Sequence, residues 1–260
     1  MPYVQNDHVT LFVTDSGPTT APAILFSNSL GTTHRMWDAV VAELSAEYRC
    51  IRYDTRGHGT STAGRAGFEI DDLAADVLDI LDRFGVGQVH FAGLSLGGMT
   101  GQVLAVKAPE RLASLTLMAT TAFMPPASAW NDRADLVRSE GMQAIVEATI
   151  QRWFTSRFIA TSPTKVERVA TEFCHVNREG YAACCEAIGR MDLRPLIGRI
   201  VTPTLIIAGA EDPATPVAMS HAMHDSIASS RLKVLGQAAH LLAIEQPEAV
   251  IDALKDHIHT

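Results

Sequence analysis

Short apolar runs alternate along this chain with segments whose apolar residues recur at helical spacing. Several of the runs are unbroken, as in parallel strands that are buried on both faces. Regular alternation of strands and helices predicts a mostly parallel central sheet with helices on both faces, an α/β fold. The expected strands are His8–Val13, Ala23–Ser27, Tyr48–Tyr53, Val89–Ala92, Leu115–Met118, Thr204–Ala208 and Leu232–Leu235.

The clearest expected helix is Ile70–Phe84, because its apolar residues form one stripe and its aspartates fall largely outside it. The alternation is then interrupted between residues 125 and 194, where helix-period segments such as Ala129–Arg138 and Met142–Phe154 occur without a convincing strand. It resumes at Val201. We therefore expect residues 1–124 and 195–260 to form the core, and residues 125–194 to form a helical cap inserted into it.

The motif Gly-x-Ser-x-Gly stands directly after the strand Val89–Ala92 and directly before a helix expected at Met99–Val106. A turn this tight strains the serine backbone, and glycine at positions 93 and 97 removes side chains that would collide. In this context the motif is typical of the nucleophile turn of the α/β-hydrolase fold. We therefore predict that Ser95 is a nucleophile whose hydroxyl points out of the carboxyl edge of the sheet.

A serine nucleophile needs a base and an acid that orients the base, and in this fold they follow the serine in the order acid, then histidine. Asp212 follows the strand Thr204–Ala208 on a proline-containing loop and is the expected acid, with Glu211 beside it as the competitor. Of the ten histidines, His240 alone lies after this acid in a short loop between a strand and a helix, so it is the expected base.

Two backbone N–H groups are expected to stabilise an oxyanion beside Ser95. One belongs to Leu96, at the N-terminus of the helix that follows the serine. The other should come from the loop after Ala23–Ser27, and counting back from Trp37 assigns it to Leu30.

Composition and charge exclude several classes of protein. The 260 residues are 47% hydrophobic and 19% charged, which is typical of a globular chain. The net charge of −8 and the lack of Lys and Arg runs argue against nucleic acid or an anionic membrane as partner. No secretory signal pattern or membrane-length apolar run appears, and the four cysteines lack zinc or disulfide spacing, so we expect reduced thiols in a cytoplasmic protein. The sequence leaves open whether the protein forms a homo-oligomer.

Motifs distributed over nearly the whole chain are shared with one family. They are Ser27-Asn28-Ser29-Leu30-Gly31-Thr32, Met36-Trp37, Arg52-Tyr53-Asp54-Thr55-Arg56-Gly57-His58-Gly59, Gly93-Leu94-Ser95-Leu96-Gly97-Gly98, Arg152-Trp153-Phe154-Thr155 and Cys185-Glu186-Ala187-Ile188. In them the chain resembles bacterial 3-oxoadipate enol-lactonases, also called β-ketoadipate enol-lactone hydrolases. The Arg-Gly-His-Gly and Gly-x-Ser-x-Gly motifs are common to many α/β-hydrolases, whereas Asn-Ser-Leu-Gly and the cap motifs point to this family. We expect His58 and Arg56 to be structural.

The resemblance implies hydrolysis of an anionic enol-lactone to 3-oxoadipate in the degradation of aromatic compounds, without a metal or an organic cofactor. Trp130 and Arg133 are three residues apart on an expected helix of the cap and match the resemblance. We expect Arg133 to bind the substrate carboxylate and Trp130 to form a wall, with Arg152 and Trp153 as the second option. A carboxylesterase or another lactonase is the main alternative. A carbon–carbon bond hydrolase and a ligand receptor remain as weaker ones.

Overall fold

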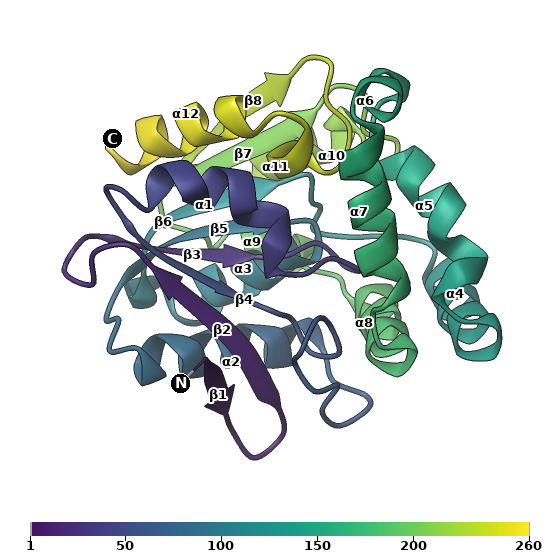
Figure 1. Ribbon diagram of the computed structural model, residues 1–260. Helices are drawn as coiled ribbons and strands as arrows, with labels where there is room; N and C mark the ends of the chain where they lie inside the picture. The colour runs from purple at the N-terminus through teal and green to yellow at the C-terminus, as the bar shows by residue number, and fades with distance from the viewer. Residues whose placement is uncertain (1, 260) are drawn as a thin grey trace.

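An eight-stranded sheet forms the centre of the molecule, for which the computed structural model describes residues 2–259 (Figure 1). The strands lie in the order β1-β2-β4-β3-β5-β6-β7-β8. The pairs β1–β2 and β2–β4 are antiparallel, and all the other pairs are parallel. The strands are β1 (Tyr3–Gln5), β2 (Thr10–Ser16), β3 (Ala23–Ser27), β4 (Arg49–Tyr53), β5 (Val89–Leu94), β6 (Leu112–Met118), β7 (Thr204–Gly209) and β8 (Ser230–Leu235).

Helices cover both faces of this sheet, as the alternation in the sequence predicts (Figure 1). On one face α1 (Asp38–Leu44) packs against α12 (Pro247–Ile258), and on the other α2 (Ile70–Arg83) packs against α3 (Leu96–Lys107). Short elements complete the core, and they are η1 (His34–Trp37), η2 (Pro109–Arg111), α9 (Arg194–Ile197), α10 (Val217–Ser226) and α11 (Leu242–Glu245).

Between β6 and β7 the chain forms a group of helices that stands to one side of the sheet in Figure 1. They are α4 (Ala127–Glu140), η3 (Met142–Ile145), α5 (Val146–Trp153), α6 (Ser156–Thr161), α7 (Pro163–Cys174) and α8 (Arg178–Arg190). We call this group the cap helices. Near the start of α8 the cap helices touch the core backbone to backbone. A Cβ built on Gly180 would lie only 2.4 Å from the Cα of Gly57, so neither position has room for a side chain.

The structure differs from the sequence expectations at several element boundaries. It adds β1, a strand of three residues, which is too short for alternation to reveal. The helix after Ser95 begins at Leu96 rather than Met99, because Gly97 and Gly98 are helical despite their poor propensity. The segment expected as one helix over Met142–Phe154 is divided into a 3₁₀ turn and α5.

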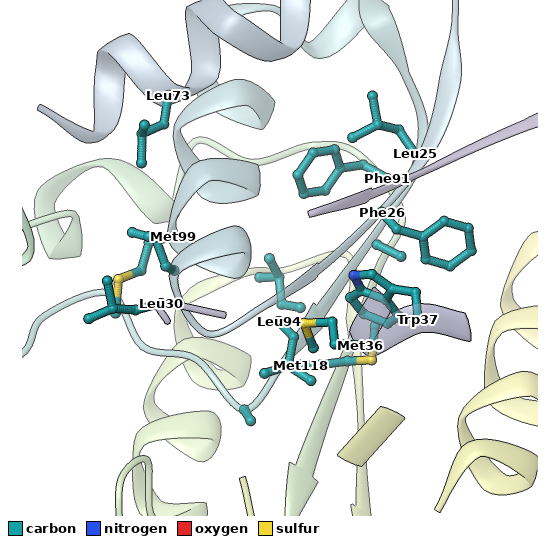
Figure 2. Close-up of a cluster of buried hydrophobic side chains, with 14 of the residues drawn as sticks. Leu25, Phe26, Leu30, Met36, Trp37, Leu73, Phe91, Leu94, Met99 and Met118 are labelled. Carbon is teal, nitrogen blue, oxygen red and sulfur yellow. The ribbon is translucent and has the colours of Figure 1, made fainter. Parts of the chain in front are cut away.

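One continuous cluster of buried apolar side chains runs through the sheet, the helices on its two faces and the cap helices. Figure 2 shows Leu94 from β5 and Met118 from β6 together with Trp37, whose ring contacts that of Phe26 at a centroid distance of 5.1 Å. All four cysteines are free thiols, of which Cys174 is half-buried and the others are buried. Burial raises the pKa of the Cys50 and Cys185 thiols to about 12, which suits the expectation of unreactive, reduced thiols.

Candidate active site

Ser95 lies at the turn between β5 and α3 with φ 56° and ψ −113°, a left-handed conformation that side-chain-bearing residues rarely adopt. The glycines of the motif explain how the turn closes. A Cβ on Gly93 would lie 2.3 Å from the carbonyl oxygen of Gly97, and one on Gly97 would lie 2.2 Å from that of Ser27. The turn is also fixed by Thr120, whose hydroxyl donates to the Ser95 carbonyl oxygen at 2.7 Å. The close packing at Gly93 and Gly97 and the hydrogen bond from Thr120 therefore hold Ser95 in its strained backbone conformation.

The N–H group of Leu96 belongs to the first residue of α3, so it has no acceptor within the helix. The next N–H, of Gly97, is taken by the Asn28 carbonyl oxygen at 2.9 Å. In the loop after β3 the N–H of Gly31 donates to His58 Nε2 at 2.9 Å. Of the residues that the structure describes, none accepts a hydrogen bond from the N–H of Leu30 or of Leu96. The two expected oxyanion donors are thus both available to a ligand.

The loop Asn28–Thr32 carries Leu30, an expected oxyanion donor, and we call it the oxyanion loop for that expectation. It is held by two buried side chains for which the sequence predicts no role at the site. The Asn28 amide donates to the Tyr53 carbonyl oxygen at 2.6 Å and accepts from the Trp37 indole at 3.0 Å. His58 accepts the Gly31 N–H at Nε2, and its Nδ1 lies 2.9 Å from the Arg56 carbonyl oxygen. Burial lowers the pKa of His58, although its bond to the Arg56 backbone opposes the shift. A neutral His58 is the form that can accept from Gly31.

Asp212 and His240 are hydrogen-bonded to each other, with 2.8 Å between Asp212 Oδ2 and His240 Nδ1. The other carboxylate oxygen, Oδ1, accepts the N–H groups of Ala214 at 2.7 Å and Thr215 at 3.0 Å. Burial alone would raise the pKa of Asp212, but His240 and the hydrogen bonds from Thr215 outweigh burial and hold this pKa below its ordinary value. Glu211, the competing acid, is exposed to solvent.

Ser95 and His240 both line one cavity of about 390 Å³ between the edge of the sheet and the cap helices. Asp212 lies behind His240 and does not line it. The core contributes the oxyanion loop and the segments after β7 and β8, and the cap contributes residues from α4, α5 and α8. The complete lining is Ser29, Leu30, Ser95, Met124, Pro125, Ala129, Trp130, Arg133, Thr149, Arg152, Trp153, Tyr181, Pro213, Ala214, Pro216, Met219 and His240.

The half-buried Arg133 faces this cavity from α4 and is held in place by two neutral hydroxyl groups. Its Nε donates to the Tyr181 hydroxyl at 2.8 Å, and its Nη2 donates to the Thr149 hydroxyl at 2.7 Å. The guanidinium also lies over the Tyr181 ring, 5.6 Å from the centroid. No carboxylate neutralises Arg133 among the ion pairs of residues 2–259. A fixed cation without a counter-ion suits an anionic ligand.

The other cap residues named by the sequence also line the cavity. Trp130 donates its indole N–H to the Met124 carbonyl oxygen at 3.1 Å, which directs its ring. Trp153 is buried, and Arg152 is exposed on α5. Tyr181 was not expected at the site. Its position beside Arg133 comes from the packing of α8 against α4, which no local pattern reveals.

Two kinds of feature are absent from residues 2–259. No group of three or more His, Cys, Asp or Glu side chains is arranged to hold a metal ion. None of the described helices is both long enough and apolar enough to cross a membrane.

Several known proteins are similar to this chain. The alpha/beta hydrolase fold family matches the chain over residues 22–168. Two proteins of Acinetobacter baylyi are similar to it. 3-oxoadipate enol-lactonase 2 is 43% identical over 92% of this chain and 89% of that protein, and 3-oxoadipate enol-lactonase 1 is 39% identical over 93% and 90%. The solved structure of the enol-lactonase from Burkholderia xenovorans LB400 superposes with a TM-score of 0.97 at 37% identity, over 100% of both chains.

Proposed function

Because this chain belongs to the 3-oxoadipate enol-lactonases of the alpha/beta hydrolase fold family, and is therefore an ester-hydrolysing enzyme, we propose that it hydrolyses 3-oxoadipate enol-lactone to 3-oxoadipate. The reaction would serve the degradation of aromatic compounds through the β-ketoadipate pathway. The observation that supports this substrate best is the juxtaposition of Ser95 and Arg133 in one cavity. An ester of a carboxylic acid with a second, free carboxylate fits such a site, because the cation can bind the carboxylate while the serine attacks the ester.

In the first half of the reaction, the Ser95 hydroxyl oxygen attacks the lactone carbonyl carbon and His240 takes the hydroxyl proton at Nε2. Asp212 accepts the Nδ1–H of His240, which fixes the ring in the tautomer whose Nε2 is free to act as a base. The negative charge that develops on the carbonyl oxygen is stabilised by the N–H groups of Leu30 and Leu96. Collapse of this intermediate breaks the ring C–O bond, and His240 gives the proton to the leaving ring oxygen. An acyl-enzyme that carries an enol remains, and His240 is neutral again.

The leaving group is an enol oxygen that stays tethered to the acyl group. As an enol it could attack the acyl-enzyme and close the ring again, whereas its keto form has no such nucleophile. Conversion to the ketone therefore drives the reaction forward. A water molecule then gives a proton to His240 and attacks the acyl carbon, and the proton returns to Ser95 as the 3-oxo diacid is released.

We further propose that residues 125–194 act as the cap over this reaction. Arg133 binds the carboxylate, and Trp130 forms a wall against the lactone ring. The cavity of about 390 Å³ is more than large enough for a small lactone.

Steady-state kinetics on the enol-lactone and on neutral aryl esters test the substrate. We expect kcat/KM to favour the enol-lactone. A preference for the neutral esters by about two orders of magnitude would instead identify a carboxylesterase with the same chemistry, a difference of about 2.7 kcal/mol in transition-state binding.

Arg133→Ala tests the carboxylate site on its own. We expect a rise in KM for the enol-lactone and little change for neutral esters, because only the former carries the charge that Arg133 binds. Arg152→Ala is the matched variant, since Arg152 is the other arginine of the cavity lining. Unchanged KM and kcat in Arg133→Ala, with a large loss in Arg152→Ala, would move the carboxylate site to Arg152.

A further inference from the structure

The loop that carries His240 is hydrogen-bonded directly to the cap helices. The N–H groups of His240 and Leu241 both donate to the carbonyl oxygen of Trp153, at 3.1 and 3.0 Å. Trp153 is the last residue of α5 and also lines the cavity. The backbone of the proposed base is therefore attached to the end of a cap helix.

Glu245 makes a second link between the same two segments. Its Oε2 accepts the N–H of Ala239, the residue before His240, at 2.9 Å. Its Oε1 accepts the N–H of Thr155 at 3.2 Å and also the Thr155 hydroxyl proton. The Glu245 carboxylate thus links the His240 loop of the core to Thr155, the N-cap residue of α6 in the cap.

Thr155 is itself part of the cap architecture. Its hydroxyl accepts the N–H of Phe158 at 3.1 Å and so caps the N-terminus of α6 while donating to Glu245. The hydroxyl can do both, because it has one proton to donate to Glu245 and lone pairs to accept the N–H of Phe158. A shift of the α5–α6 junction would be transmitted through Thr155 and Glu245 to the residue beside His240.

We propose that Glu245 is a positioning residue that sets His240 against Ser95 by clamping the His240 loop to the cap segment Trp153–Thr155. This proposal depends on the proposed function in one respect, which is that His240 acts as the base for Ser95. Glu245 contacts neither substrate nor reacting atoms, so it acts through the placement of the imidazole. A displacement of about 1 Å in such a group can cost about 100-fold in rate.

Glu245→Gln weakens the bridge made by Glu245 with almost no change in volume and leaves the bonds to the Trp153 carbonyl oxygen in place. The amide has one acceptor oxygen, so its NH₂ group must face either the Ala239 N–H or the donors of Thr155. Glu248→Gln is the matched control, because Glu248 is an exposed glutamate at the start of α12. Thr155→Val removes the hydroxyl part of the same link from the cap side and leaves only the backbone N–H of residue 155 on Glu245, whereas Thr155→Ser keeps the hydroxyl.

The rate at which a fluorophosphonate labels Ser95 measures activation of the serine without any lactone. We expect labelling to be about 10- to 100-fold slower in Glu245→Gln and in Thr155→Val, and unchanged in Glu248→Gln and Thr155→Ser. With an aryl acetate, kcat should fall by a similar factor while KM stays the same. The double variant Thr155→Val/Glu245→Gln should be less impaired than the product of the single effects, because both remove one bridge.

The outcomes separate this inference from the proposed function. If the unmodified protein is not labelled at Ser95, the proposed nucleophile is wrong. If it is labelled and Glu245→Gln reacts equally fast while only its melting temperature falls, the glutamate is merely structural and the positioning role is overturned. If Glu245→Gln does not fold, Thr155→Val decides by the same measurement.

Discussion

Replacing Asp212 by asparagine should inactivate the enzyme through the tautomer of His240. The orientation of the new amide is dictated by its surroundings, because Oδ1 of Asp212 accepts two backbone N–H groups, from Ala214 and Thr215. The asparagine must keep its oxygen there, which places its NH₂ where Oδ2 now lies, 2.8 Å from His240 Nδ1. That NH₂ would donate to Nδ1, so the imidazole proton would move to Nε2.

A histidine protonated at Nε2 cannot accept the proton of Ser95. Loss of the correct tautomer costs about 10⁴-fold in kcat in the well-studied serine proteases, or about 5.4 kcal/mol of transition-state stabilisation. We expect a loss of that order in Asp212→Asn, with KM nearly unchanged because Asp212 does not line the cavity. Initial rates on an aryl ester and on the enol-lactone measure it, and a circular dichroism melt checks that the variant is folded.

Glu211→Gln is the control, since Glu211 precedes Asp212 in the chain but is exposed. It should keep the full activity. If Asp212→Asn retains more than about a tenth of kcat while Glu211→Gln loses activity, the assignment of the acid and the reasoning from tautomers are both refuted.

Three further predictions concern the turn, the cation and the effect of pH. Gly97→Ala should abolish soluble expression or activity, because its Cβ would lie 2.2 Å from the Ser27 carbonyl oxygen, whereas Gly87→Ala, with open space around it, should have no effect in the same assay. Tyr181→Phe keeps the ring but removes one hydrogen bond from the guanidinium of Arg133, so KM for the enol-lactone should rise about 5- to 10-fold while kcat on neutral esters stays constant. Chemical denaturation at pH 7.5 and 5.5 should show lower stability at the lower pH. Three buried or half-buried histidines have a lowered pKa, so the unfolded chain binds protons before the folded chain as the pH falls through about 6.5. The slope of the unfolding free energy can reach at most about 1.4 kcal/mol per pH unit for each histidine, and a flat profile would contradict the lowered pKa values. These histidines are His58, His90 and His257.

The conformation of the turn at Ser95 could be predicted from the sequence because it depends on local contacts. The strain at Ser95 requires glycine at positions 93 and 97, and those residues are visible in any short stretch of the chain. Asp212 and His240 could be selected because parallel strands bring the loops at their carboxyl ends to one edge, in a known chain order. Their chemical roles remain predictions.

The surroundings of Arg133 and the role of Glu245 could not be predicted, because they depend on contacts between segments that are distant in the sequence. The two hydroxyl groups that hold Arg133 belong to Thr149 and Tyr181, which lie on other helices of the cap. The periodicity of a single sequence does not predict how those helices pack against one another. The role of Glu245 could not be predicted from the sequence either. A glutamate on a four-residue helix gives no periodic signal, and its partner Thr155 lies 90 residues earlier in the chain.

The close approach of Gly57 and Gly180 has a consequence for recombination between relatives. A chimera that takes residues 125–194 from one parent and the remainder from another inherits the two glycines from different sources. Since a Cβ on either would lie 2.4 Å from the opposing Cα, a single alanine in one parent would push α8 away from the core. A functional chimera would have to take positions 57 and 180 from the same parent. Crossovers at residues 125 and 194 separate these two positions, although nothing in the sequence near the crossovers indicates the conflict.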